Sequence, residues 1–124
     1  MPSCKKNIRN TLGYVILALN TVAANHLAPT SEVPLGGEIY HDRCEVCHGS
    51  QGDGKTFAAN ALFPPPKNFR AESNKKELPR ERMIRSVTRG RPGTAMMPWE
   101  NILSKQEIHS VVNYIRQILM GPHK

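Results

Sequence analysis

The residues whose types and spacing stand out for their chemistry are Cys44, Cys47 and His48, which lie in the pentapeptide CEVCH. Two thiols at this spacing can reach the two vinyl groups of a haem and become thioethers, and the next residue can turn its imidazole under the porphyrin to bind iron. Covalent attachment would hold the cofactor even in a small domain. The motif therefore predicts one haem c per chain, attached through both cysteines, with His48 as the proximal iron ligand.

A structural zinc site is the main alternative, because the same three residues could supply three of four tetrahedral ligands. Zinc sites are usually completed by a second closely spaced pair. The remaining histidines show no such spacing: His26, His41, His109 and His123. A redox-active disulfide between the two cysteines belongs to a βαβ pattern that the sequence lacks. Haem attachment is therefore favoured over both alternatives.

A second candidate for iron binding lies in the segment 93–99, which reads GTAMMPW. The thioether of a methionine is soft and favours reduced iron, so a His/Met pair raises the reduction potential relative to harder ligands. The glycine before and the proline after predict a loop that bends and then stiffens. Met83 and Met120 fall on helix faces, where methionine fills a core. One of Met96 and Met97 is expected to be the distal ligand, and the residues alone leave both open.

Helical segments must position these ligands. Leu35, Ile39 and Tyr40 recur at helical spacing before Cys44, which predicts a short amphipathic helix that leads into the motif. A second helix is predicted over residues 79–89, because proline suits a first turn and Gly90 can end a helix. Between these helices, the GDG of residues 52–54 predicts a turn and the PPP of residues 64–66 an extended loop.

The last helix has the clearest local signals. Ser104 and Glu107 form a capping box, and Leu103 and Ile108 occupy the two staple positions. One apolar stripe follows, made of Ile108, Val111, Val112, Ile115, Ile118 and Leu119, and Gly121-Pro122 should end the helix. No strand pattern is evident, so the predicted class is all-α, with three to five short helices and long loops.

The N-terminal region predicts export. Lys5, Lys6 and Arg9 precede a mostly apolar run over residues 12–24, as in a secretory signal peptide. The run is shorter than the roughly 20 residues that a membrane-spanning helix needs. The expected organisation is a signal peptide over 1–24, a flexible lead-in over 25–34 and one domain over 35–124. A periplasmic or otherwise exported location follows, with membrane contact only through a partner or a retained signal segment.

Charge points to the kind of partner. The formal net charge is +7, and nine basic residues between positions 67 and 91 face only three acidic ones: Lys67, Arg70, Lys75, Lys76, Arg80, Arg82, Arg85, Arg89 and Arg91 against Glu72, Glu77 and Glu81. A solvated helix face is the ordinary explanation. The functional alternative is a rim that steers the protein to a redox partner with an acidic docking surface. Nucleic acid is not an expected partner, because export would separate the two and no interleaved aromatic set is present.

From position 35 to about 119 the chain resembles the bacterial class I cytochromes c. Gly36 and Tyr40 match the glycine and aromatic of that family's first helix, residues 44–49 match its haem-attachment site, and residues 52–54 match its next turn. Residues 93–96 with Trp99 are similar to its distal ligand loop. The resemblance implies the class I cytochrome c fold, with helices and loops wrapped around one covalently bound haem.

The resemblance also implies roles for single residues. In the family, the methionine three residues before the tryptophan binds iron, which assigns Met96 as the distal ligand and leaves Met97 as the alternative. A backbone carbonyl of the proline loop, at Pro64 to Pro66 here, accepts the ring N–H of the proximal histidine. Tyr114 matches an aromatic that packs across the first helix.

Together these features predict a carrier that passes single electrons by outer-sphere transfer in a respiratory or related periplasmic chain. It is expected not to be an enzyme, so no catalytic residues are assigned. Two alternatives stay open. One is a cytochrome subunit held in a larger oxidoreductase complex, and the other is a haem sensor or enzyme in which the methionine leaves and a small molecule binds iron.

Overall fold

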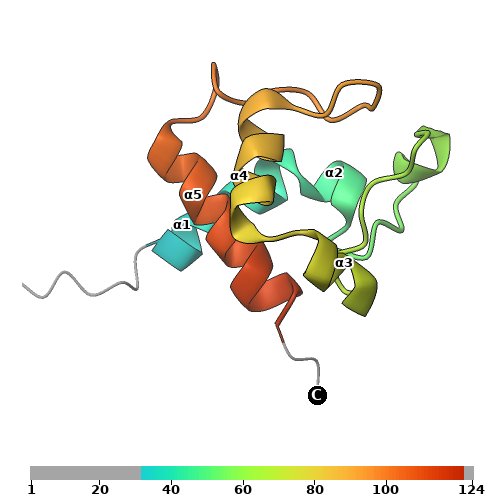
Figure 1. The fold of residues 1–124 in the computed structure, drawn as a ribbon, viewed down its shortest axis with the longest axis horizontal. Coiled ribbons are helices and arrows are strands. Elements are labelled where there is room, and N and C mark those ends of the chain that lie inside the picture. Colours follow the sequence, from blue (N-terminus) through green and yellow to red (C-terminus); the bar gives the residue numbers. More distant parts are fainter. Residues whose placement is uncertain (1–31, 122–124) are drawn as a thin grey trace, which may run out of the picture.

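The computed structural model describes residues 32–121 (Figure 1). The predicted signal peptide lies outside the described residues, as does most of the lead-in, so both stay predictions. The elements are α1 (Glu32–Arg43), α2 (Glu45–His48), the short 3₁₀ turn η2 (Ala59–Ala61), α3 (Glu72–Glu77), α4 (Arg80–Arg89), α5 (Lys105–Tyr114) and its π-helical extension η3 (Ile115–Leu119). No described residue forms a strand, which confirms the all-α class. None of the helices within 32–121 has the length and apolar character needed to cross a membrane.

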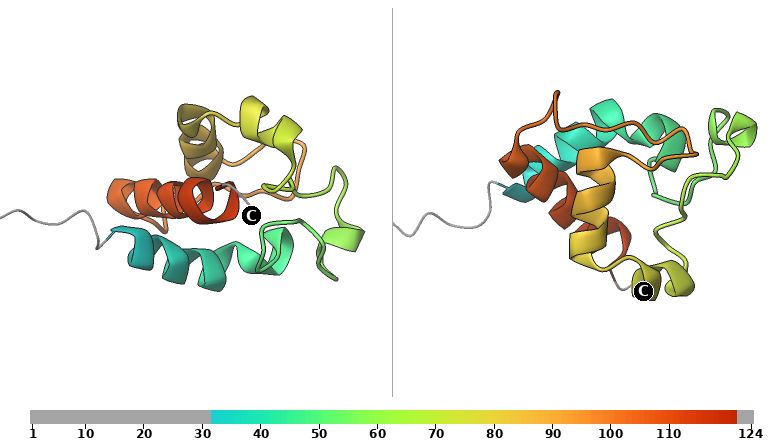
Figure 2. Two further views of the ribbon diagram at one scale, coloured as in Figure 1. Left: turned by 90° about the horizontal axis from the view of Figure 1, so that it is seen from below. Right: turned by 45° about the horizontal axis from the view of Figure 1, so that its top comes forward.

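The helix α5 lies between α1 and α4 (Figure 2). Its contact with α1 is close because Gly36 has no side chain at the crossing, where a Cβ would overlap the carbonyl oxygen of Ser110. Beside it, a Cβ at Gly37 would lie 3.2 Å from Cε2 of Tyr114. The rings of Tyr40 and Tyr114 stand 5.5 Å apart between their centroids. These contacts confirm the prediction that Tyr114 packs across the first helix.

The start of α1 corrects the predicted boundary at residue 35. The helix begins at Glu32, so residues 32–34 of the predicted flexible lead-in belong to it. Pro34 was read as part of a loop, but it lies in the first helical turn. The first four backbone N–H groups of a helix have no acceptor within the helix, so a residue that lacks this group is tolerated there.

Both later helices follow their predicted local signals. Pro79 precedes α4, and Gly90 ends it with a φ of 68°. At α5 the capping box is complete, because Ser104 N donates to Glu107 Oε2 at 2.7 Å and Glu107 N donates to Ser104 Oγ at 3.2 Å. The boundaries of these elements are therefore set by interactions within a few residues of each other.

The end of α5 departs from the predicted apolar stripe. Ile118 was expected to be buried, yet 52% of its surface is exposed, whereas Leu119 and Met120 are buried. Met120 N donates to the carbonyl of Ile115 at 2.8 Å, a bond between residues five apart. This wider π-helical turn rotates the following side chains relative to an α-helix. Ile118 therefore turns to solvent and Met120 takes a place in the core.

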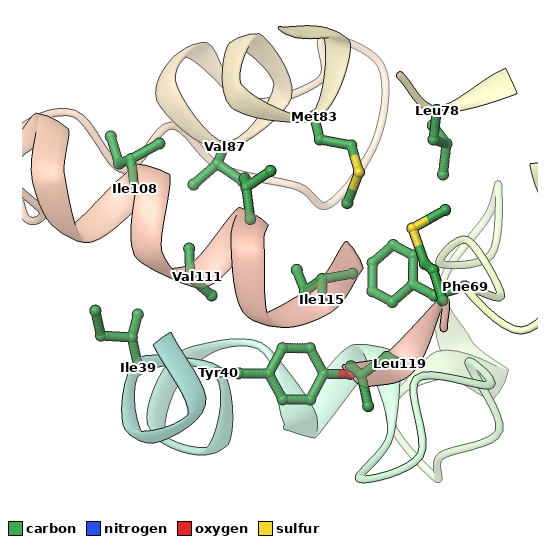
Figure 3. Close-up of a cluster of buried hydrophobic side chains, with 12 residues drawn as sticks. Ile39, Tyr40, Phe69, Leu78, Met83, Val87, Ile108, Val111, Ile115 and Leu119 are labelled. Carbon is green, nitrogen blue, oxygen red and sulfur yellow. The ribbon is translucent and has the colours of Figure 1, made fainter. Parts of the chain in front are cut away.

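Side chains from α1, α4 and α5 with its extension η3 form one core, together with three positions outside these helices, Phe69, Leu78 and Met120 (Figure 3). Tyr40 and Val111 have no exposed surface, and Ile108 is 2% exposed. At one end of this core Phe69 and Leu78 approach Ile115, as the close-up shows. Phe69 and Leu78 belong to the long connection 49–79, whereas the second long connection, 90–104, joins the end of α4 to the start of α5. Through Phe69 and Leu78 the core continues into the region that holds the candidate site.

We predict that Gly36→Ala destabilises the fold far more than Gly37→Ala. The new methyl group at Gly36 meets the backbone of Ser110, which cannot move without shifting α5, so the free energy of unfolding should fall by about 3 kcal/mol. At Gly37 the neighbour is the edge of the Tyr114 ring, which can rotate, and alanine is the better helix former. Gly37→Ala should therefore change the free energy of unfolding by no more than about 1 kcal/mol. Urea unfolding followed by circular dichroism measures both; equal losses would contradict the close crossing.

Candidate cofactor site

A cavity of about 450 Å³ opens beside the core, between α2, α4, the start of η3 and the two long loops. All four predicted site residues line it: Cys44, Cys47, His48 and Met96. The structure therefore brings the CEVCH motif and the methionine loop, far apart in the sequence, to opposite parts of one space. Its walls are mainly apolar, and no aspartate or glutamate lies among the described residues that line it.

The two cysteines sit where α1 passes into α2. Cys44 N donates to the Tyr40 carbonyl at 2.8 Å, and His48 N donates to the Cys44 carbonyl at 2.9 Å, so the helical path continues through the motif. Both thiols are free. Burial, with a smaller contribution from Cys47, raises the pKa of the Cys44 thiol to about 11. At neutral pH the Cys44 thiol therefore carries its proton.

Tyr40 holds the chain as it leaves the motif. Its phenol is buried and donates to the Gly49 carbonyl at 2.6 Å. Burial raises the pKa of Tyr40, so this donor keeps its proton. Gly49 has a φ of 81°, and Gly54 N donates to the His48 carbonyl at 2.8 Å. The predicted turn at residues 52–54 is confirmed, because it folds back directly onto His48.

The imidazole of His48 is oriented on two sides. Its ring stacks on Phe69 with 4.7 Å between centroids and 14° between planes. Its Nδ1 lies 3.2 Å from the Lys67 carbonyl. A carbonyl can only accept, so Nδ1 carries the proton and the lone pair of Nε2 is left for a metal. Burial lowers the pKa of His48, opposed in part by this hydrogen bond, and the ring is therefore neutral at pH 7.

The carbonyl that orients His48 belongs to Lys67, the residue directly after the predicted proline loop, and α3 holds it in place. Lys67 Nζ donates to Asn74 Oδ1 at 3.3 Å and to Glu77 Oε2 at 3.2 Å. Asn74 Nδ2 donates to the Asn68 carbonyl at 2.8 Å. The sequence analysis missed α3 because this helix buries no residue and so has no apolar period to detect.

The methionine loop is tied to the end of α4 by its backbone. Arg91 N donates to the Met96 carbonyl at 2.9 Å, and Met96 N donates to Thr94 Oγ1 at 3.1 Å. Met96 packs partly buried against the core, whereas Met97 is 48% exposed, although both line the cavity. The geometry therefore favours Met96 over Met97 as a ligand. Trp99 also packs against the core and lines the same space.

The donor set fits a haem better than a bare metal ion. Two thiols, an imidazole and a thioether line one cavity, and apolar side chains such as Leu78 and Val87 form part of its walls. Cationic residues, including Arg82 and Arg91, also reach the cavity and match the carboxylates that haem carries. Within residues 32–121 no three His, Cys, Asp or Glu side chains converge as a metal-ion site, so the zinc alternative gains no support.

Comparison with known proteins agrees with this composition of the site. The family model described as cytochrome c oxidase, cbb3-type, subunit III matches residues 31–115. A comparison with curated proteins gave no match.

Solved structures share the fold. The KustC0563 c-type cytochrome is 25% identical, with a TM-score of 0.56 over 67% of this chain and 95% of that one. A chain of the Kuenenia stuttgartiensis reducing HAO-like protein complex Kustc0457/Kustc0458 is 26% identical, with a TM-score of 0.56 over 68% of this chain and 41% of that one.

We predict that Tyr40→Phe lowers the free energy of unfolding by about 1 kcal/mol. The Gly49 carbonyl would lose its hydrogen bond from the phenol but keep the one from Gly52 N at 2.9 Å. The loss of stability should therefore lie at the low end of the range for removing a hydrogen bond to a buried acceptor. Tyr114→Phe is the matched control, because no described residue bonds to that hydroxyl. Thermal unfolding compares the two; a control as damaging as Tyr40→Phe would remove the hydrogen bond as the cause.

Proposed function

This chain belongs to the class I cytochrome c family, in which haem c is bound covalently, and on that premise we propose that it carries single electrons through one haem held by Cys44, Cys47, His48 and Met96. The observation that carries the proposal is the convergence of these four side chains on one apolar cavity without carboxylates. When bound, haem supplies reversible one-electron chemistry at its iron.

Each residue has a distinct task in this proposal. The Cys44 and Cys47 thiols would hold the haem through two covalent thioether links. His48 offers the lone pair of Nε2, because its Nδ1 proton is donated to the Lys67 carbonyl. Met96 offers its thioether from the opposite loop. A histidine oriented in this way is also made more basic by its hydrogen bond.

In this proposal the protein is a carrier and not an enzyme. His48 and Met96 would both hold the iron, so no coordination position would be left for a substrate, and the haem would supply outer-sphere electron transfer. The protein's residues would then exclude water and keep the ligand set unchanged between oxidation states. The hydrogen bond between Met96 N and Thr94 Oγ1 and the stacking of His48 on Phe69 support this role. Because both residues are held in place, the geometry of the site should change little between oxidation states, and the reorganisation energy of electron transfer should be small.

We further propose that the protein acts outside the cytoplasm, in a respiratory or related chain, with an acidic redox partner. Export rests on the sequence of residues 1–24. Arg43, a basic residue at the cavity with no ion pair to the described residues, supports an acidic partner. Because one similar chain comes from a protein complex, a role as a cytochrome subunit of a larger oxidoreductase is the second candidate.

The decisive experiment is mass spectrometry of the protein from a host that assembles c-type cytochromes. We expect the mass of the polypeptide plus one haem, retained after denaturation. Cys44→Ala and Cys47→Ala should each leave a single thioether link and lower the yield of attached haem. Bare polypeptide from the unmodified chain would overturn the proposed function.

The distal ligand can be identified by the weak near-infrared charge-transfer band between methionine sulfur and ferric haem. We expect Met96→Ala to abolish this band and to let carbon monoxide bind the reduced protein, because it opens one face of the iron. Met97→Ala is the matched control and should leave both properties unchanged, since Met97 is half exposed. If the band survives in Met96→Ala and disappears in Met97→Ala, the assignment is reversed.

A further inference from the structure

The basic stretch of residues 67–91 divides into paired and unpaired charges. Lys67 bonds to Glu77, and Lys75 bonds to Glu72. Arg70 and Arg80 are held by the side chains of Gln51 and Asn113. In contrast, the guanidinium groups of Arg85, Arg89 and Arg91 have no hydrogen bond or ion pair with the described part of the chain, and Arg82 bonds only to the neutral carbonyl of Glu77. Lys76, on α3, also has no partner in the described part of the chain, so the largest group of such charges lies on α4 and at the residue beyond its end.

These four arginines surround a cleft. Positions 82, 85 and 89 share one face of α4, and Arg91 follows Gly90, so the helix and the first residues of the methionine loop form the two sides. The cleft has a volume of about 360 Å³ and is lined by Arg82, Arg85, Ser86, Arg89, Gly90, Arg91 and Pro92. No carboxylate is among these lining residues. The ordinary reason to gather arginines, pairing with acidic side chains of the same protein, is therefore absent.

We propose that this arginine cleft binds a small anion of the phosphate class, such as pyrophosphate or the diphosphate of a nucleotide. Guanidinium groups present planar forks of N–H donors that match phosphate oxygens, and lysine lacks this geometry. The volume lies within the range of small-molecule sites, and the cleft is widely open to solvent, so an anion can enter it directly. The Ser86 hydroxyl adds a neutral donor at the wall of the cleft.

Arg85 and Arg89 make this cleft a site of its own. Arg82, Ser86 and Arg91 line the haem cavity as well, so their donors are also available to the carboxylates of haem. Arg85 and Arg89 line only the cleft, and both are exposed. The affinity for an added anion should therefore depend mainly on these two residues, whose replacement leaves the haem cavity intact.

The cleft is coupled to the methionine loop, an inference that rests on the proposed function. Arg91 N donates to the Met96 carbonyl, and the Arg91 carbonyl accepts from Thr94 N at 3.0 Å. A negative charge bound beside the haem cavity stabilises the more positive, oxidised iron, so the anion should lower the reduction potential. By linkage, reduction should weaken anion binding by the same factor.

The test is calorimetric titration of the haem-loaded protein with pyrophosphate at constant ionic strength. We expect saturable binding of one anion per chain. The double variant Arg85→Gln/Arg89→Gln should bind about a hundredfold more weakly, because each charge-assisted contact contributes about tenfold. Arg70→Gln/Lys76→Gln removes the same charge away from the cleft and should bind like the unmodified protein.

Three results would overturn the proposal. One is an absence of saturable binding, and another is an equal loss in both double variants, which would mean diffuse attraction to a basic protein. The third is tight binding of an acidic peptide with none of pyrophosphate, which would make the cleft a protein-docking surface. The coupling is tested by measuring the reduction potential at increasing concentrations of pyrophosphate. The inferred coupling is wrong if pyrophosphate binds and the potential does not change. Since binding is measured without redox chemistry, saturable binding that is weakened in Arg85→Gln/Arg89→Gln would support the cleft even if the purified chain carried no haem, so the failure of the proposed function and the failure of the cleft can be told apart.

Discussion

The close crossing of α1 and α5 at Gly36 is the contact on which the rest of the structure depends. Because no side chain separates the helices there, the Tyr40 and Tyr114 rings meet and the end of α1 is fixed against the core. Cys44 directly follows Arg43, the last residue of that helix. The crossing therefore determines where the CEVCH motif stands relative to α4 and the methionine loop, and with it the shape of the cavity.

Around the cavity, hydrogen bonds to the backbone add to side-chain packing in holding the candidate ligand residues. On one side the Lys67 carbonyl orients His48, and α3 holds Lys67 through polar contacts alone. On the other side Met96 is tied to Arg91 and Thr94. A domain of this size can bury little apolar surface in its loops, so hydrogen bonds and ion pairs are an effective way to make these loops rigid.

Charge is distributed unevenly over the same framework. Near α3, Lys67, Arg70 and Lys75 bond to acidic or amide side chains, and the bonds of Lys67 hold the loop that orients His48. Basic residues on the outer face of α4 are left without carboxylate partners and surround a cleft that adjoins the haem cavity. One stretch of sequence with a uniform excess of positive charge thus serves two purposes, and only the geometry of the helices separates them.

The sequence by itself determined the all-α class, the CEVCH motif, the extent of α4 and the capped start of α5, because spacing, capping and turn preferences act between residues a few positions apart. The tertiary structure decided the rest. Pro34 proved to be inside α1, Ile118 turned to solvent in a π-helical turn, and α3 formed without an apolar face. The choice of the Lys67 carbonyl and the burial of Met96 over Met97 likewise depend on contacts between segments distant in the chain, which no local pattern encodes.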